Sequence, residues 1–384
     1  MYRFLISTSV VFALFATILP KSNSFAAEVS MKTVTMLPAK HPIGKSFNGF
    51  IKRLNAALKG EFKLDWRGGP EVVPQFKQPN AVRLGSVDAC ITSPSYANGI
   101  VKVSGSANYS NKQYNEVKAT GYHEYMAKLH AARGLIYVGD LPVSQLKFHI
   151  FLRKPIKTID DLKNMKIRVF PAIAPVIKAL GGNPVVLPMP QIYTAMERGV
   201  VSGFVTGVSG VAKKYKEVLG AYIEPGFYRA TFHFLVNPKS WAKVPAATRA
   251  KVINFVRNVD PPTYEAGWNP ALRGGYADLK KGGIKTIQFP PDVAAKFKRT
   301  VLDAAWSAVR KKAPKEGKIL QKMLTKSFKM LKELMLNYLH LIYQREAPLH
   351  LKIQFRTLLK LPISLLKLSR KDCQKNNRFM TRLN

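Results

Sequence analysis

Short apolar strands alternate with amphipathic helices in two separate parts of the chain, and this alternation limits the possible folds more than any other feature. In the first part, strands are predicted at residues 33–36, 62–66 and 87–92. The helices between them are expected to begin at Ser46, as an N-cap, and near Pro79, which suits a first helical turn. Alternation of this kind requires crossover helices, so it predicts parallel strands in an α/β sheet.

The same order of elements returns about 114 residues later. After a short helix capped by Asp160, the pattern predicts strands at 165–170, 185–187 and 200–206, separated by helices at 174–180 and 191–198. Residues 81–92 align without a gap with residues 195–206, and alanine, glycine, valine and threonine recur at identical offsets. Two such lobes facing each other would bring strand ends, Thr92 and Thr206 among them, to a shared crevice, where open α/β sheets bind ligands.

The chain lacks the common signatures of catalysis. It has neither a G-x-S-x-G nucleophile elbow nor a G-x-G-x-x-G dinucleotide motif. The sequence Gly44-Lys45-Ser46 follows a strand, but a phosphate-binding P-loop needs glycine where this chain has Ala39. His123 and His130 are expected on one helix face rather than as metal ligands, and Cys90 in a buried strand. We therefore expect no enzymatic activity, no cofactor and no metal.

One charged residue stands out among the predicted strands. Side chains alternate along the strand at 165–170, so Ile167 and Val169 face one side and Arg168 the other. Arg168 lies near the carboxyl end of the strand, just before Pro171, so its guanidinium is expected to point into the crevice. There it would pair with a carboxylate through two charge-assisted hydrogen bonds. An arginine on an exposed sheet edge is the alternative interpretation.

Several segments resemble the extracytoplasmic solute receptors of tripartite ATP-independent periplasmic (TRAP) transporters. They are Gly68 to Pro74 with Gln78-Pro79 after it, Lys154 to Arg168, Leu180 to Val185, and Tyr193 to Gly203. The likeness runs from about residue 33 to residue 320, and the order and spacing of the segments carry it.

The resemblance implies an α/β, two-lobed periplasmic binding protein fold with a hinge and a long helix that spans both lobes. One lobe would comprise residues 27–149 with about 234–282, and the other residues 150–233 with about 283–325. The resemblance further implies that the protein is a receptor and not an enzyme. It would bind a small organic acid, usually a carboxylate, through an arginine at the position of Arg168, and deliver it to the permease subunits of a TRAP transporter for uptake driven by an ion gradient.

We expect a set of ligand-binding residues around this arginine. The set comprises Arg168, Lys147, Glu71, Tyr96, Thr206, Phe170 and Tyr228. Lys147 stands where many members of the family have a second arginine and would add charge. Glu71, Tyr96 and Thr206 would bind polar groups, whereas Phe170 and Tyr228 would form walls. A lysine in place of the second arginine leaves the identity of the ligand open.

The two ends of the chain differ in composition from its body. Residues 1–26 combine a positive start, an apolar run from Phe4 to Leu19 and small residues before a cut, as in a secretory signal peptide. An uncleaved membrane anchor is the alternative. Export predicts a periplasmic protein that meets no nucleic acid. Residues 326–384 contain 13 Lys and Arg against three acidic residues, and are expected either as an appendage outside the domain or as a basic amphipathic segment on an anionic membrane surface.

The charge of the whole chain is unusual, with 61 Lys and Arg against 22 Asp and Glu and a formal net charge of +39. A charge of this size concerns partners and solubility rather than the fold. Two alternatives to a solute receptor stay open at this point. One is an exported α/β enzyme that uses the same crevice, and the other is a basic protein that adheres to anionic lipid or polysaccharide.

Overall fold

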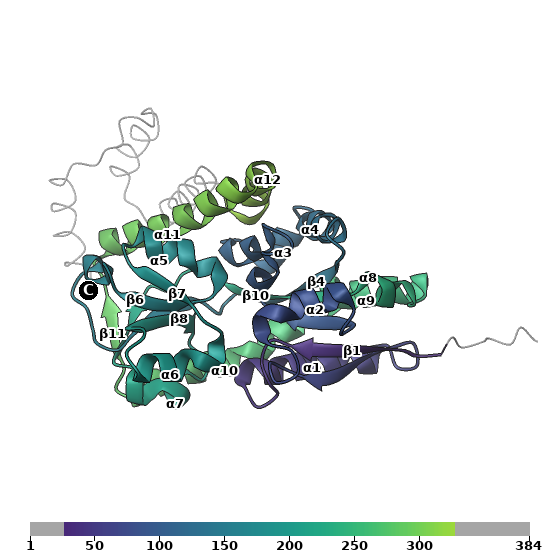
Figure 1. Ribbon diagram of the computed structural model, residues 1–384, viewed down its shortest axis with the longest axis horizontal. Coiled ribbons are helices and arrows are strands. Elements are labelled where there is room, and N and C mark those ends of the chain that lie inside the picture. The colour runs from purple at the N-terminus through teal and green to yellow at the C-terminus, as the bar shows by residue number, and fades with distance from the viewer. Residues whose placement is uncertain (1–26, 327–384) are drawn as a thin grey trace, which may run out of the picture. The chain divides into compact units, whose positions relative to one another are not determined.

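Two β-sheets organise residues 27–326, the part of the chain that the computed structural model describes (Figure 1). The first sheet has the order β2 (Phe62–Gly68), β1 (Val29–Thr35), β3 (Ala89–Thr92), β10 (Ala230–Val236), β4 (Ile136–Val143). The second has the order β11 (Lys285–Gln288), β9 (Ala221–Glu224), β5 (Phe148–Leu152), β8 (Gly203–Gly207), β6 (Lys166–Val169), β7 (Asn183–Val186). The predicted signal peptide, and the predicted tail apart from Lys326, lie outside the described residues.

The repeated pattern in the sequence becomes the same arrangement of strands in both sheets. In the first sheet β1 pairs in parallel with β2 and β3, and the crossovers are α1 (Pro42–Ala57) and α2 (Gln78–Leu84). In the second, β6 pairs in parallel with β7 and β8, through α5 (Ala174–Ala179) and α6 (Ile192–Glu197). The prediction of two α/β units with parallel strands is therefore confirmed.

A glycine in the left-handed region follows the corresponding crossover helix in each unit. Gly85 follows α2 with φ +83°, and Gly199 follows α6 with φ +68°. Only glycine adopts such φ values without strain, so these positions end the helices as predicted. The strands that follow start later than predicted, β3 at Ala89 and β8 at Gly203, because the residues in between complete the turn.

Two predicted helix starts are wrong. The first helix begins at Pro42, and the Nδ1 atom of His41 accepts a hydrogen bond from the Ile43 N–H at 3.2 Å. Proline fits the first helical position because its φ is already helical, so the helix starts before Ser46. The short helix expected from Asp160 is a 3-10 turn at Ile159–Leu162, and Thr158 caps it together with Asp161.

The chain passes between the sheets more than once. Strand β5 begins at Phe148 in the second sheet, and β10 returns to the first sheet at Ala230, antiparallel between β3 and β4. These crossings fall close to the predicted limits of the lobes. The domain boundaries themselves remain a prediction. We call the parts built on the first and second sheets the first and second lobes.

The long helix α10 (Pro261–Lys281) spans both lobes, as expected. Near its start, the Tyr264 hydroxyl lies 3.0 Å from the Ser46 hydroxyl of α1 in the first lobe. Near its end, Gly275 packs directly against the backbone of Val208, which follows β8 in the second lobe. Asp278 pairs at 3.7 Å with Lys213 of α7 (Val211–Tyr215), also in the second lobe. Helix α10 therefore contacts the first lobe near its start and the second lobe near its end.

The remaining helices pack on the sheets or on other helices next to them (Figure 1). They are α3 (Tyr114–Lys118), α4 (Tyr122–Ala131), α8 (Pro238–Ala242), α9 (Ala246–Asn254), α11 (Pro291–Lys312) and α12 (Pro314–Leu324). Helix α11 packs against α5 and against the 3-10 helix Ser104–Tyr109, so it also contacts both lobes. Within residues 27–326, no helix combines the length and the apolar character needed to span a bilayer.

Two neighbouring glycines of α10 test the close contact between this helix and the second lobe. A Cβ atom at Gly275 would lie 2.9 Å from the Val208 carbonyl oxygen, whereas one at Gly274 would meet nothing within 4 Å. Alanine is favoured over glycine in a helix by about 1 kcal/mol, so Gly274→Ala should raise the free energy of unfolding by about that amount. Gly275→Ala should lower it, as measured by urea denaturation. Equal stabilisation by both variants would contradict the contact.

Candidate ligand-binding site

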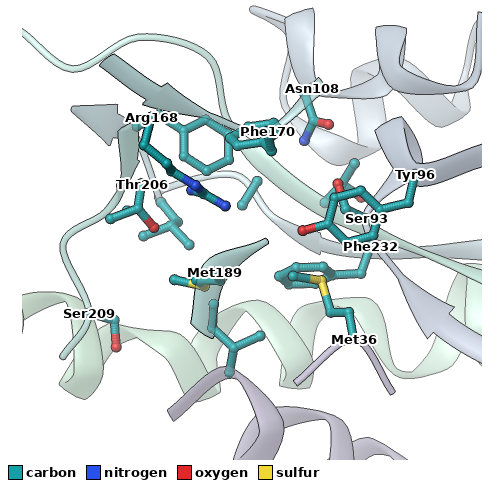
Figure 2. Close-up of a pocket in the computed structure, with 16 residues that line it drawn as sticks. Met36, Ser93, Tyr96, Asn108, Arg168, Phe170, Met189, Thr206, Ser209 and Phe232 are labelled. Carbon is teal, nitrogen blue, oxygen red and sulfur yellow. The ribbon is translucent and has the colours of Figure 1, made fainter. Parts of the chain in front are cut away.

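A cavity lies between the two sheets, at the carboxyl ends of their parallel strands (Figure 2). Its empty space, counted out into the open mouth, is about 600 Å³, and the part that the centre of a water-sized sphere can reach is about 50 Å³. Among the described residues, the lining consists of Met36, Ile43, Ser93, Tyr96, Asn108, Leu146, Phe148, Arg168, Phe170, Met189, Thr206, Gly207, Ser209, Ala230, Thr231 and Phe232. Both lobes contribute, so a ligand held here would contact both.

Arg168 supplies the charge of this cavity and is held in place by its neighbours in the sheet. It lies on β6, between β8 and β7 in the second sheet, so residues on both sides of β6 approach its side chain. Its Nε–H donates to the Leu187 carbonyl at 2.8 Å, and its Nη1 group donates to the Val205 carbonyl at 3.2 Å. Only 2% of the residue is exposed. The two bonds fix the guanidinium plane before any ligand arrives.

The remaining face of the Arg168 guanidinium has no partner in the described part of the chain. Its Nη2 group makes no hydrogen bond there, and no carboxylate of residues 27–326 pairs with it. Burial lowers the pKa of Arg168 to about 10, partly opposed by Tyr96 and Tyr215, so the group is still charged at neutral pH. A buried cation without a counter-ion is unfavourable and favours an anion that approaches it.

Three more of the predicted site residues lie on the cavity with Arg168. Thr206 is on β8 and Phe170 directly follows β6, whereas Tyr96 comes from the first lobe, after β3. Figure 2 shows the Arg168 guanidinium and the Tyr96 hydroxyl pointing into the same space from opposite sides. Burial raises the pKa of Tyr96 to about 12, although Arg168 acts to lower it. Tyr96 is therefore a neutral hydrogen-bond donor at neutral pH.

The other three predicted site residues lie outside the lining of this cavity. The Lys147 Nζ donates to the Ser144 carbonyl at 3.0 Å, and burial, with Arg229 nearby, lowers the pKa of Lys147. Lys147 lines a separate hollow together with Tyr228, whose hydroxyl donates to the Val301 carbonyl of α11 at 3.1 Å. Glu71 is exposed, and its Oε1 accepts a hydrogen bond from the Gly69 N–H at 2.7 Å. Each side chain therefore has a local structural partner.

Sequence reasoning also missed part of the lining. Thr92 was expected at the crevice, but it is fully buried within the first sheet, and the next residue, Ser93, lines the cavity instead. Ser93 and Met36 directly follow β3 and β1, so the rule that ligands bind at strand ends could have found them. Asn108 and Met189 come from 3-10 turns, and no sequence pattern points to them.

The family model of the bacterial extracellular solute-binding proteins, family 7, matches residues 33–312 of the chain. The chain belongs to this family. The matched range contains every described residue that lines the cavity and both sheets, apart from the first four residues of β1. The family consists of solute-binding proteins and not of enzymes, so the membership supports a receptor.

Relatives of this family 7 protein include two proteins named for binding solutes. A monocarboxylate 2-oxoacid-binding periplasmic protein of Nostoc sp. is 27% identical over 223 residues, which cover 52% of this chain and 59% of the relative. A solute-binding protein of Roseobacter denitrificans is 21% identical over 237 residues, 59% of this chain and 71% of the relative. The chain thus matches somewhat more than half of the length of the Nostoc protein.

Solved structures of similar fold include solute-binding proteins with bound acids. A TRAP periplasmic solute-binding protein from Desulfovibrio salexigens with bound orotic acid superposes with a TM-score of 0.70 at 18% identity, over 77% of this chain and 97% of that one. A Bordetella pertussis extracytoplasmic solute receptor binding pyroglutamic acid superposes with a TM-score of 0.66 at 18% identity, over 77% of this chain and 99% of that one. At such identities the likeness shows the fold, and it confirms the two-lobed binding protein fold predicted above.

Proposed function

We propose that this family 7 protein is a periplasmic receptor that binds a small organic acid between its lobes and delivers it to a TRAP permease for uptake driven by an ion gradient. The buried, unpaired guanidinium of Arg168 on the wall of the cavity is the observation that carries the proposal. Known binding proteins of similar fold hold orotic acid and pyroglutamic acid, which both carry a carboxylate. Family membership, fold and site chemistry therefore point in the same direction.

The geometry of Arg168 suggests how the carboxylate binds. The Nε–H already bonds the Leu187 carbonyl, and one Nη1 hydrogen bonds the Val205 carbonyl. The hydrogens that remain belong to the end of the guanidinium fork, which can bind both oxygens of one carboxylate. Tyr96 and Thr206 would bind polar groups next to it, and Phe170 would form a wall. The structure gives other partners to Lys147, Glu71 and Tyr228. We therefore do not include these three side chains among those that bind the carboxylate and its neighbouring groups.

Closure of the two lobes would strengthen this contact. The cavity takes side chains from both sheets, so movement of one lobe toward the other removes water from the ion pair. A ligand stabilises the closed form only by the extent to which it binds that form more tightly. Tyr96 of the first lobe and Arg168 of the second would both contact the ligand in the closed form. Together they would supply this difference in affinity between the closed and open forms.

The proposal also includes export of the protein by residues 1–26 and delivery of the ligand to the permease. The predicted signal peptide would bring the protein into the periplasm, where the receptor meets the permease. The basic tail predicted from residue 326 would stay outside the domain, with the membrane surface as its proposed partner.

Isothermal titration calorimetry with a panel of organic acids tests the proposed function. The panel contains pyroglutamate, orotate, D-glucuronate and several 2-oxoacids, and native mass spectrometry of the purified full chain shows whether an acid is retained. We expect at least one acid to bind with a Kd at or below about 10 μM, close to −7 kcal/mol. Absence of binding by every acid, together with turnover of an ester or amide substrate in the same cavity, would instead support the enzyme alternative.

A further inference from the structure

The cavity presents one positive charge, which limits the number of acid groups it can hold. Among the described residues that line it, Arg168 is the one charged side chain. Lys147, expected to add a second charge, faces a different hollow and donates to Ser144. A second carboxylate in the cavity would therefore be buried without a counter-ion, which is strongly unfavourable.

Apolar side chains form the part of the wall away from Arg168. Figure 2 shows Met36 and Phe232 together across the cavity from the guanidinium, and Met189 below the guanidinium in this view. Each of them is at most 8% exposed, and Ile43, Leu146 and Phe148 extend the same surface. Apolar surface of this kind favours alkyl or aromatic groups and offers no partner to hydroxyl groups.

The free polar groups are few. The hydroxyls of Tyr96 and Thr206 make no hydrogen bond within residues 27–326, and Asn108 Oδ1 is buried without a partner there. The Ser93 hydroxyl already lies 3.1 Å from that of Ser95, and the Thr231 hydroxyl donates to the Leu141 carbonyl at 3.4 Å. The Ser209 hydroxyl also lines the cavity and makes no hydrogen bond within residues 27–326. These few groups can satisfy neutral polar atoms of a ligand next to them, but the apolar part of the wall cannot satisfy a chain of hydroxyls.

We propose that the ligand is a monocarboxylate with an apolar remainder, and that the cavity rejects dicarboxylates and polyhydroxylated sugar acids. The inference rests on the proposed function and adds a substrate class to it. The carboxylate would bind Arg168, an oxo or hydroxy group next to it would meet Tyr96 or Thr206, and an alkyl or aryl body would lie against Met36 and Phe232.

A matched pair of ligands tests the class on the wild-type full chain. In 5-methyl-2-oxohexanoate an isopropyl group replaces the distal carboxylate of 2-oxoglutarate, so the two acids have nearly the same shape and differ in charge. Calorimetry should show the monocarboxylate binding at least about 100-fold more tightly, because the second carboxylate would be desolvated without a partner. D-Glucuronate should bind more weakly than the monocarboxylate by at least about tenfold, since its hydroxyls would lack partners.

A substitution on the apolar wall tests the cause of the preference. Met36→Lys adds a cation opposite Arg168 and should narrow the difference between the two matched acids by at least about tenfold. Met36→Leu keeps the wall apolar and should leave their ratio within about threefold. If Met36→Lys does not fold, the wild-type comparison still decides the question.

The outcomes separate the two proposals. If 2-oxoglutarate or D-glucuronate binds as tightly as 5-methyl-2-oxohexanoate, and Arg168→Ala abolishes that binding, the monocarboxylate class is wrong and the receptor function stands. If no acid of any class binds, the proposed function fails and the class inference fails with it. A wild-type preference for the monocarboxylate that Met36→Lys narrows supports both.

Discussion

Replacing Arg168 by methionine should weaken the binding of the organic acid by at least about 30-fold, which corresponds to roughly 2 kcal/mol or more. Methionine has a similar length but leaves the ligand carboxylate without a counter-charge in a cavity closed to water. Arg168→Lys should also weaken binding, because an ammonium group cannot form the planar fork that binds both carboxylate oxygens. Calorimetric titration with the tightest acid of the panel measures both effects.

The stability of the same variants separates a binding role from a structural one. Removing Arg168 loses its bonds to Leu187 and Val205, but it also removes a buried charge without a counter-ion. We expect these effects to oppose each other, so the free energy of unfolding of Arg168→Met should lie within about 2 kcal/mol of the wild type. Arg198→Met, at an exposed arginine of the same lobe, is the matched control and should change neither quantity. Unchanged affinity in folded Arg168→Met would remove Arg168 from the site.

The arrangement of Arg168 in the sheet could be predicted because it depends on local patterns. Strand side chains alternate with a period of two, and Pro171 follows the strand, so the sequence alone indicates which face Arg168 occupies. The two strand-helix units could be predicted for a similar reason. Gly85 and Gly199 end helices at equivalent positions, and the apolar strands after them lie in the middle of each sheet.

The positions of Lys147 and Tyr228 could not be predicted, because they depend on how the chain crosses between the sheets. Phe148 lines the cavity, and its neighbour Lys147 points to another hollow. Tyr228 has a φ of +54°, which no sequence pattern indicates, and its ring packs on Tyr109 with centroids 4.8 Å apart. A match to a family position therefore locates the backbone of such a residue but not the direction of its side chain.

The histidines of α4 show a second limit of sequence reasoning. Their spacing predicts a shared helix face, but the groups that this face meets come from distant strands. His123 Nδ1 lies 2.8 Å from the Tyr137 hydroxyl, which donates to Asp140 Oδ1 at 2.8 Å. His130 Nε2 lies 3.3 Å from the Ser104 hydroxyl. These residues form a buried polar network in the first lobe, away from the cavity.

This network should make the protein less stable in acid. Burial lowers the pKa of His123 to about 3, with Arg257 and Lys118 acting in the same direction, and burial lowers the pKa of His130 to about 4. In the unfolded chain both side chains titrate near pH 6.5. Their neutral forms therefore contribute full stability above pH 6.5, and this contribution is lost as the pH falls toward the native values. The pKa of His233 is lowered by burial as well, so it adds to the effect.

Asp140 acts in the opposite direction over part of the same range. Burial raises its pKa to about 6, although the Tyr137 hydroxyl bond and Arg229 act to lower it. Its protonated form is therefore favoured in the native state, and protonation of Asp140 below pH 6 offsets part of the loss from the histidines. For His123 and His130, two histidine protons against the one carboxyl proton, at about 1.4 kcal/mol per proton and pH unit, give a net loss of ~3 kcal/mol between pH 6.5 and 4.5, to which His233 adds.

Urea denaturation across pH 4.5 to 6.5 measures this loss and locates its source. His123→Gln and His130→Gln remove one titrating group each, so each variant should reduce the dependence of the unfolding free energy on pH by about 1.4 kcal/mol per pH unit. Lys128→Gln, at an exposed residue of the same helix, is the matched control and should leave the dependence unchanged. A wild-type slope that survives in both histidine variants would place the acid sensitivity elsewhere, because buried neutral histidines must bind protons on unfolding below pH 6.5.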